Sequence, residues 1–367
     1  MRHPSPVSRA AAVVAAGALA LGAVGAATPA QAGPAPGSAE SAADWLVAQT
    51  NAEHLVHNDQ FDFDDYGLTA DIVLGLDGLG LASYAAPMAD ALAGHVDDWT
   101  TYKRQVFAGS VAKAVVVAQE NGYDPTSYGG VDLVSRLEAR VSSDKPIVGR
   151  VEDKAPDDYV NVVGQAFATQ ALGVAGSDRA AQVRGYLLKQ QCSAGYFRLN
   201  LPGKAKQDQS CDAGSRTGIS APDTDATALA VLSLQALPAG ATTTKVRAAI
   251  TDALTWLKRR QKDNGSFGGG TSTEASNANS TGLAGWALGE AGACRAADKA
   301  AAWVSKLQVP ADQAGPLVDD PGAIAYDRAA FDSAVGTGIT VEARDQWRRA
   351  SAQAAPALQY DLVSCQA

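Results

Sequence analysis

The chain has 367 residues, 46% of them hydrophobic, and a formal net charge of −9. This acidity disfavours binding to nucleic acids and to anionic membranes, because the protein would repel phosphate groups. The length exceeds that of an average domain, although proteins built from repeats reach this size with a single core.

Residues 1–32 have the pattern of a secretory signal peptide. Arg2 and Arg9 precede an apolar run at residues 10–27, and Ala30-Gln31-Ala32 matches a signal-peptidase cleavage site. Residues 33–40 are rich in Gly and Pro and are predicted to be a flexible linker. We therefore expect a secreted, extracellular protein without a membrane span in its mature form.

Residues 41–367 are predicted to form one domain of repeated helices. One sequence frame recurs: a first residue, a small or β-branched residue two positions later, Ala at +5 and Gly at +15. Its period of about 52 residues is that of a repeated supersecondary unit. The copies begin at Asp65, Phe107, Asn161, Asp225 and Asn279, and Asp327 begins a degenerate copy.

Between these helices lie others that carry an aromatic residue, and they are more highly charged. The aromatic residues are Trp45, Tyr186, Trp256 and Trp303. Framed helices rich in Ala and Gly belong in an interior, whereas the charged helices can form an outer layer. The sequence therefore predicts an all-α (α/α)6 toroid plus a short C-terminal helix, with hairpins at 42–80, 84–122, 131–176, 178–240, 243–292 and 295–338.

A second motif joins an outer helix to the segment after it. It is seen as Gln191-x3-Gly195-Tyr-Phe197 and as Gln261-x3-Gly265-Ser-Phe267, with Gln308 in a partial copy. This spacing resembles the QW repeat of the squalene cyclase and prenyltransferase superfamily, although Phe replaces the usual final Trp. The resemblance spans about residues 40 to 340 and implies an α/α toroid. The family includes cyclases, prenyltransferases and single-toroid binding domains.

Four cysteines in an exported chain suggest two disulfides, for which three connectivities exist. Cys192 and Cys211 bracket one loop between helices and are predicted to pair, which leaves Cys294 and Cys365 as partners. His57 lies in an acidic loop that ends at Asp65, and we interpret this loop as a solvated connector. We expect neither a metal nor another cofactor.

Residues at the start of the inner helices should ring one mouth of the toroid. They are Asp65, Tyr66, Phe107, Tyr159, Asn161, Asp225, Asn279, Tyr326 and Asp327, and Trp286 is expected to face the interior. Polar residues at these positions either cap the helices or form the rim of a ligand site above an apolar cavity.

The run Asp223-Thr224-Asp225-Ala226-Thr227 resembles the Asp-x-Asp-Asp-Thr box of class II terpene cyclases. The resemblance implies that Asp225 is a general acid aided by Asp223. However, Ala226 replaces the last acid of the box, and the family's cyclases place the pocket between two toroids, whereas this chain has residues for one.

These departures favour a monomeric extracellular binding or interaction module, with an unknown small-molecule or extracellular ligand and without catalysis. The alternative is a terpenoid cyclase-like enzyme that uses Asp225 as its acid. A further alternative is an (α/α)6 carbohydrate-active enzyme in which Asp65 and Asp225 serve as general acid and base.

Overall fold

The computed structural model describes residues 38–360. The chain divides into units 1–32 and 33–367, and the predicted export signal lies outside the described residues. The helices are α1 (Ser38–Val47), α2 (Tyr66–Gly78), α3 (Ala82–Gly94), α4 (Val96–Thr100), α5 (Ala108–Glu120), α6 (Leu133–Glu138), α7 (Val162–Val174), α8 (Ala180–Leu188), α9 (Thr224–Gln235), α10 (Thr244–Arg260), α11 (Ala278–Glu290), α12 (Cys294–Val304), α13 (Arg328–Thr337) and α14 (Val341–Ala354).

Short elements connect the helices. Two antiparallel hairpins pair β1 (His57–Asn58) with β2 (Phe63–Asp64), and β3 (Thr101–Tyr102) with β4 (Gln105–Val106). The 3-10 turns are η1 (Cys211–Ala213), η2 (Ser305–Leu307), η3 (Gly315–Leu317) and η4 (Ala355–Gln359). Among residues 38–360, no helix is both long and apolar enough to cross a bilayer.

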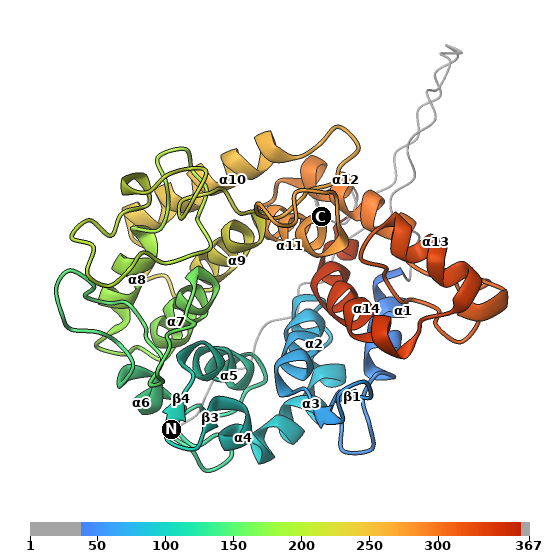
Figure 1. Cartoon of the computed structure of the whole chain (residues 1–367), viewed down its shortest axis with the longest axis horizontal. Coiled ribbons are helices and arrows are strands. Elements are labelled where there is room, and N and C mark those ends of the chain that lie inside the picture. The colour runs from blue at the N-terminus through green and yellow to red at the C-terminus, as the bar shows by residue number, and fades with distance from the viewer. Residues whose placement is uncertain (1–37, 361–367) are drawn as a thin grey trace, which may run out of the picture. The chain divides into compact units, whose positions relative to one another are not determined.

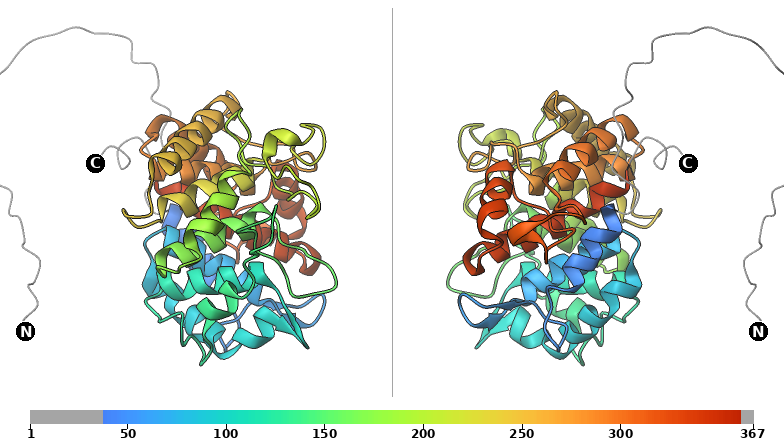
Figure 2. Two further views of the ribbon diagram at one scale, coloured as in Figure 1. Left: turned by 90° about the vertical axis from the view of Figure 1, so that its left-hand side faces the viewer. Right: turned by 90° about the vertical axis from the view of Figure 1, so that its right-hand side faces the viewer.

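The inner helices form a closed ring. In the order α2, α5, α7, α9, α11 and α14, each contacts the next, and α14 contacts α2 (Figure 1). Outside them lie α1, α3, α6, α8, α10 and α12, so the described part of the chain contains six outer-to-inner hairpins. This confirms the predicted all-α (α/α)6 toroid. The loops that precede α7 and α9 extend on the same side of the ring (Figure 2).

The sixth hairpin differs from the prediction. Asp327 was expected to begin an inner helix, but it caps α13, which lies outside the ring. The sixth inner helix is α14, and η4 follows it. Helix α14 fits into the ring because its two neighbours carry glycines where it packs. A Cβ on Gly75 of α2 would lie 2.5 Å from the Ala352 carbonyl oxygen, and one on Gly282 of α11 would lie 2.2 Å from the Ala354 Cα.

The Gln-x3-Gly motif joins α8 to α10 and α10 to α12. The Gln191 side-chain amide donates to the carbonyls of Gly195 and Ala249, each at 2.8 Å, and Ala249 belongs to α10. Gln261 likewise donates to Gly265 at 3.0 Å and to Ala296 of α12 at 2.8 Å. One side chain therefore holds both its own turn and the neighbouring hairpin.

The same arrangement closes the ring between its last and first outer helices. Gln308, which follows α12, donates to the Ser38 carbonyl of α1 at 2.6 Å and to the Gly322 carbonyl at 3.3 Å. Gly322 has φ +88°, and a Cβ there would lie 2.0 Å from the Ser41 carbonyl. The partial motif at Gln308 is therefore a full copy in space, with a longer interval before its glycine.

A disulfide joins Cys192 to Cys211, as predicted. Both residues pack with buried Tyr196 beside the loop that leads to α9. Cys294 begins α12, and Cys365 lies outside the described residues, so a second bridge between them stays a prediction.

Replacing Gly265 with Ala is expected to lower the free energy of unfolding by roughly 2–4 kcal/mol. Gly265 has φ +92°, and a Cβ would lie 2.2 Å from the Lys299 carbonyl of α12. Urea denaturation would measure the loss. The matched control is Gly185→Ala on α8, where a Cβ meets nothing within 4 Å; equal losses for the two variants would contradict this role of Gly265.

Candidate functional site

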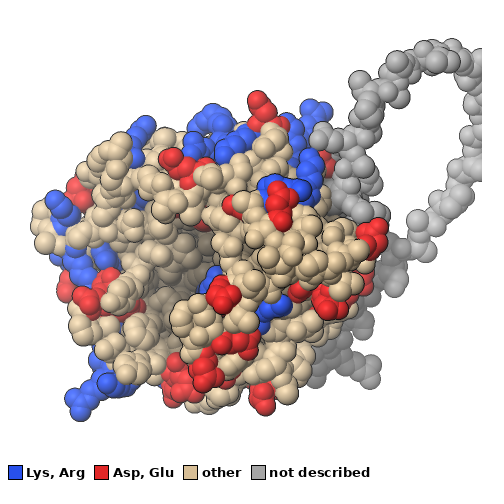
Figure 3. Space-filling view, turned by 45° about the vertical axis from the view of Figure 1, so that its right-hand side comes forward, with Lys and Arg blue, Asp and Glu red and all other residues tan. Residues whose placement is uncertain are grey.

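A central cavity of about 720 Å³ runs along the ring axis. Its lining includes residues from all six inner helices, from Gly67 and Gly109 near their N-terminal ends to Glu120 and Glu290 near their C-terminal ends. The space-filling view shows a hollow whose floor consists mostly of uncharged atoms (Figure 3). A ligand in this cavity would contact every hairpin of the repeat.

One lining residue from each inner helix forms what we call the middle layer. On five helices this residue is the sixth after the N-cap. On α14 it is identified through Ser351, whose hydroxyl accepts from a loop amide as that of Thr69 on α2 does. The middle-layer residue of α14 is the second after Ser351, just as that of α2 is the second after Thr69. Because the hairpins are equivalent, these residues lie at one level. The middle layer consists of Asp71, Lys113, Phe167, Leu229, Leu283 and Gln353.

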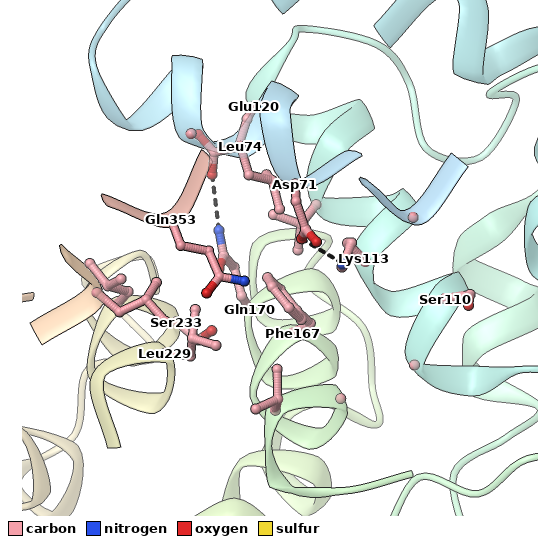
Figure 4. Close-up of a pocket in the computed structure, with 18 of the residues that line it drawn as sticks. Asp71, Leu74, Ser110, Lys113, Glu120, Phe167, Gln170, Leu229, Ser233 and Gln353 are labelled. Atoms are coloured by element: carbon pink, nitrogen blue, oxygen red, sulfur yellow. Dashed lines mark hydrogen bonds and ion pairs between the residues drawn. The ribbon is translucent and has the colours of Figure 1, made fainter. Parts of the chain in front are cut away.

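The middle layer is polar on one side and apolar on the other. Gln353, Asp71 and Lys113 come from the adjacent helices α14, α2 and α5, whereas the three apolar residues come from α7, α9 and α11. Lys113 Nζ lies 2.7 Å from Asp71 Oδ1 and 5.9 Å from the Phe167 ring centroid (Figure 4). A molecule at this level would therefore meet a charged pair on one flank and hydrocarbon on the other.

The end of the cavity at the helix C-termini contains carboxylates. Gln170 donates to Glu120 Oε1 at 2.9 Å (Figure 4), and Asn121 donates to Asp77 Oδ2 at 2.9 Å. Burial raises the pKa of Asp77 to about 6, and the charge of Glu120 adds to this effect. Trp286, predicted to face the interior, lines this end.

Three residues predicted at the mouth line the cavity: Phe107, Tyr159 and Asn161. Asp65 and Tyr66 instead line a second hollow of about 410 Å³, which shares Gly67 with the central cavity. Tyr66 stacks on His95 with ring centroids 5.1 Å apart.

Several predicted mouth residues cap helices. Asp65 accepts from the Leu68 amide at 2.8 Å, and Asn161 accepts from the Gly164 amide at 3.1 Å. Asp65 also pairs with Arg349 at 2.7 Å. Each cap satisfies an amide that the helix leaves without a backbone partner.

The other mouth residues do not cap inner helices. Phe107 precedes α5 but makes no side-chain cap, and Asp153 accepts from the first amide of α5 in its place. On α9 and α11 the caps are Asp223 and Asn277, so Asp225 and Asn279 lie two residues further along. The sequence frame placed Asp225 and Asn279 at the cap position, which is an error of two residues.

Asp225 is half-buried beside a glycine-rich segment and does not line the cavity. Ideal Cβ atoms on Gly269 and Gly270 would lie 3.1 Å from Asp225 Oδ2 and 2.4 Å from Asp223 Oδ2, so this segment runs directly against both acids. Asp225 Oδ1 is buried without a hydrogen-bond partner. Burial raises the pKa of Asp225 to about 6, and the charge of Asp223 adds to the shift.

Tyr326 is affected by the charge of Asp225, whereas Asn279 contacts the middle layer. The pKa of Tyr326 is raised by burial and by the charges of Asp225 and Asp327. Asn279 donates to Gln353 Oε1 at 2.8 Å.

The acidic loop before α2 is held by its own contacts. His57 Nδ1 lies 2.9 Å from Asp64 Oδ1, and His57 Nε2 lies 3.4 Å from Asp62 Oδ1. Its pKa is raised, mainly by the hydrogen bond to Asp64. Within residues 38–360, no group of His, Cys, Asp or Glu side chains is arranged to hold a metal ion.

The sequence analysis predicted none of the six middle-layer residues, although a signal was present. Asp71 and Lys113 are charged residues within helices made mostly of apolar and small residues. Each lies six residues after the first residue of its frame. It is therefore four residues, about one helical turn, after the small residue at +2 and lies on the same face of the helix. A charge on the inward face of a buried helix requires a partner, and here each supplies the other.

The chain matches no protein-family model. No curated protein is significantly similar to it in sequence. Among solved structures, a protein from Actinoplanes is 18% identical with a TM-score of 0.56, over 88% of this chain and 98% of that chain. A variant of the type II terpene cyclase MstE from Scytonema, in complex with geranylgeranyl dihydroxybenzoate, is 14% identical with a TM-score of 0.58, over 88% and 96%.

The fold is that of a terpenoid cyclase-like toroid. A glycosidase variant in complex with glucose is also similar, with 13% identity and a TM-score of 0.52 over 89% of this chain and 96% of that chain. The MstE chain is matched over nearly its whole length, so that cyclase is comparable in size to this toroid.

Replacing Asp225 with Asn is expected to stabilise the protein at pH 8 by roughly 1–2 kcal/mol. The folded-state pKa of about 6 exceeds the value of about 3.9 in an unfolded chain. The native state therefore binds more protons at Asp225 between these values, and the contribution of Asp225 to stability rises as pH falls from about 7 to 4. The difference between the two proteins should shrink over that range.

Urea denaturation at several pH values would test this expectation. The control is Asp263→Asn, which removes a charge from an exposed side chain and should change the stability at pH 8 much less than Asp225→Asn does. A variant less stable than wild type at pH 8 would show that the Asp225 carboxylate makes favourable contacts, and would contradict the assignment.

Proposed function

We propose that this protein binds an elongated, mostly apolar small molecule inside the toroid. The observation that carries the proposal is the central cavity of about 720 Å³ with its half-apolar middle layer. Ligand sites of about 300–1,000 Å³ are typically apolar with a few polar groups that fix orientation. The predicted export signal supports binding outside the cell as part of this proposal.

The apolar side supplies the affinity in this proposal. Phe167, Leu229 and Leu283 present hydrocarbon at mid-height, and Trp286 continues the surface towards the C-terminal end. Removing apolar ligand surface from water contributes about 25 cal/mol per Å² before the costs of association. The structurally similar glycosidase variant is in complex with glucose, but the hydrocarbon on this side of the cavity favours an apolar molecule over a sugar.

Replacing Leu229 with Trp tests where binding occurs, because the larger ring would fill the middle layer. Binding of the neutral fluorescent probe N-phenyl-1-naphthylamine is expected to weaken by at least about tenfold. Val335→Trp on α13 is the control, since Val335 is 40% exposed and belongs to no lining segment. Equal probe affinity in wild type and Leu229→Trp would place binding elsewhere.

A second candidate function is a terpenoid cyclase-like enzyme. It is supported by the fold and by two carboxyl groups whose pKa values are raised to about 6, Asp77 on the cavity wall and Asp225 beside the glycine segment. A carboxylic acid that holds its proton near neutral pH can protonate an alkene. The carbocation would close a ring, and loss of a proton to the carboxylate would restore the acid.

Incubation with farnesol, geranylgeraniol or squalene, followed by gas chromatography and mass spectrometry, tests this candidate. Cyclised product that disappears in Asp77→Asn alone would place the acid on the cavity wall. Product that disappears only in Asp225→Asn would support the sequence prediction. Absence of product from all three compounds, in protein that binds the fluorescent probe, would count against the enzyme and leave the binding function.

A further inference from the structure

We infer that the ligand is uncharged and that a hydroxyl-like group on it, able both to donate and to accept a hydrogen bond, is recognised by Asp71, Lys113 and Gln353. This inference rests on the proposed function and names the class of its ligand. It follows from three features of the cavity: its charge balance, the pairing of its cation, and the position of the polar side chains.

The charge balance disfavours an anion. Within residues 38–360, the charged side chains that line the cavity are one lysine, Lys113, and the carboxylates of Asp71, Asp77, Glu120, Asp153 and Glu290. Charges interact more strongly in a partly buried site than in water. A carboxylate or diphosphate ligand would enter a region of excess negative charge.

The cation is already engaged. Lys113 Nζ is 2.7 Å from Asp71 Oδ1, and the two side chains remain 21% and 19% exposed, respectively. Because this pair is neutral overall, it offers an anion little attraction. Its exposed part can still form hydrogen bonds, since an ammonium group has three donors and a carboxylate has two oxygens.

The three polar side chains come from adjacent inner helices and belong to the middle layer of the cavity. Gln353 lies in the same part of the cavity as the ion pair (Figure 4), and its Oε1 is already engaged by Asn279. The trio therefore offers donors from Lys113 and Gln353 and an acceptor from Asp71. A hydroxyl group can satisfy both kinds of partner, whereas a carboxylate can only accept.

The matched ligands farnesol and farnesoic acid test the inference, because they share one chain and differ at its end. Each would compete with N-phenyl-1-naphthylamine at pH 8, where the acid is ionised. Farnesol is expected to displace the probe at a concentration at least about tenfold lower than farnesoic acid. Farnesoic acid that competes as well as farnesol, or better, would overturn the inference.

Asp71→Asn provides a second readout, because it releases Lys113 from its ion pair without changing side-chain size. Competition by farnesoic acid should improve by at least about tenfold relative to competition by farnesol, because the variant frees the ammonium for a carboxylate and loses a charged acceptor for the hydroxyl. Asp263→Asn, the same change on an exposed residue, should alter neither. If Asp71→Asn does not fold, Glu120→Gln also lowers the negative charge and should improve competition by the acid.

The outcomes of these experiments distinguish a failure of the inference from a failure of the proposed function. Failure of wild-type protein to bind the fluorescent probe or either ligand would refute the proposed function. Normal probe binding without preference for farnesol would refute the inference alone. Farnesylamine serves as a third arm, and tighter binding of this cation than of farnesol would overturn the assignment of an uncharged ligand.

Discussion

The toroid depends on a contact between a left-handed glycine and the backbone of the next outer helix. Gly195, Gly265 and Gly322 each bring their main chain so close to a carbonyl of α10, α12 or α1 that no side chain fits between them. A glutamine amide then joins the two segments. Because these contacts fix the spacing of the hairpins, they also fix the width of the cavity that the inner helices enclose.

Much of this architecture could be predicted, because the Gln-x3-Gly motif is local in sequence. Gln191 with Gly195, and Gln261 with Gly265, reveal two hairpins directly. The sixth inner helix could not be found in this way. It lacks the frame of small residues, and the room for it comes from glycines on α2 and α11, some 70 to 280 residues distant.

The candidate site shows a similar division. The polar residues at helix starts were correctly expected to include caps, as Asp65 and Asn161 are. A shift of two positions turns a helical residue by about 200°, so the misaligned frame named Asp225 and Asn279 in place of the caps Asp223 and Asn277. Gly269 and Gly270 pack against Asp225 and Asp223, respectively. This contact is made by the tertiary structure and could not be predicted from the acidic run at residues 223–227 alone.

Ring closure links the two extremes of the described chain. Asp345 of α14 accepts from Asn58, Arg349 pairs with Asp65, and α14 packs along α2. During synthesis, one side of the first hairpin therefore stays unpacked until α14 has been made. Such long-range contacts slow folding, and they make completion of the cavity one of the final steps in the maturation of the protein.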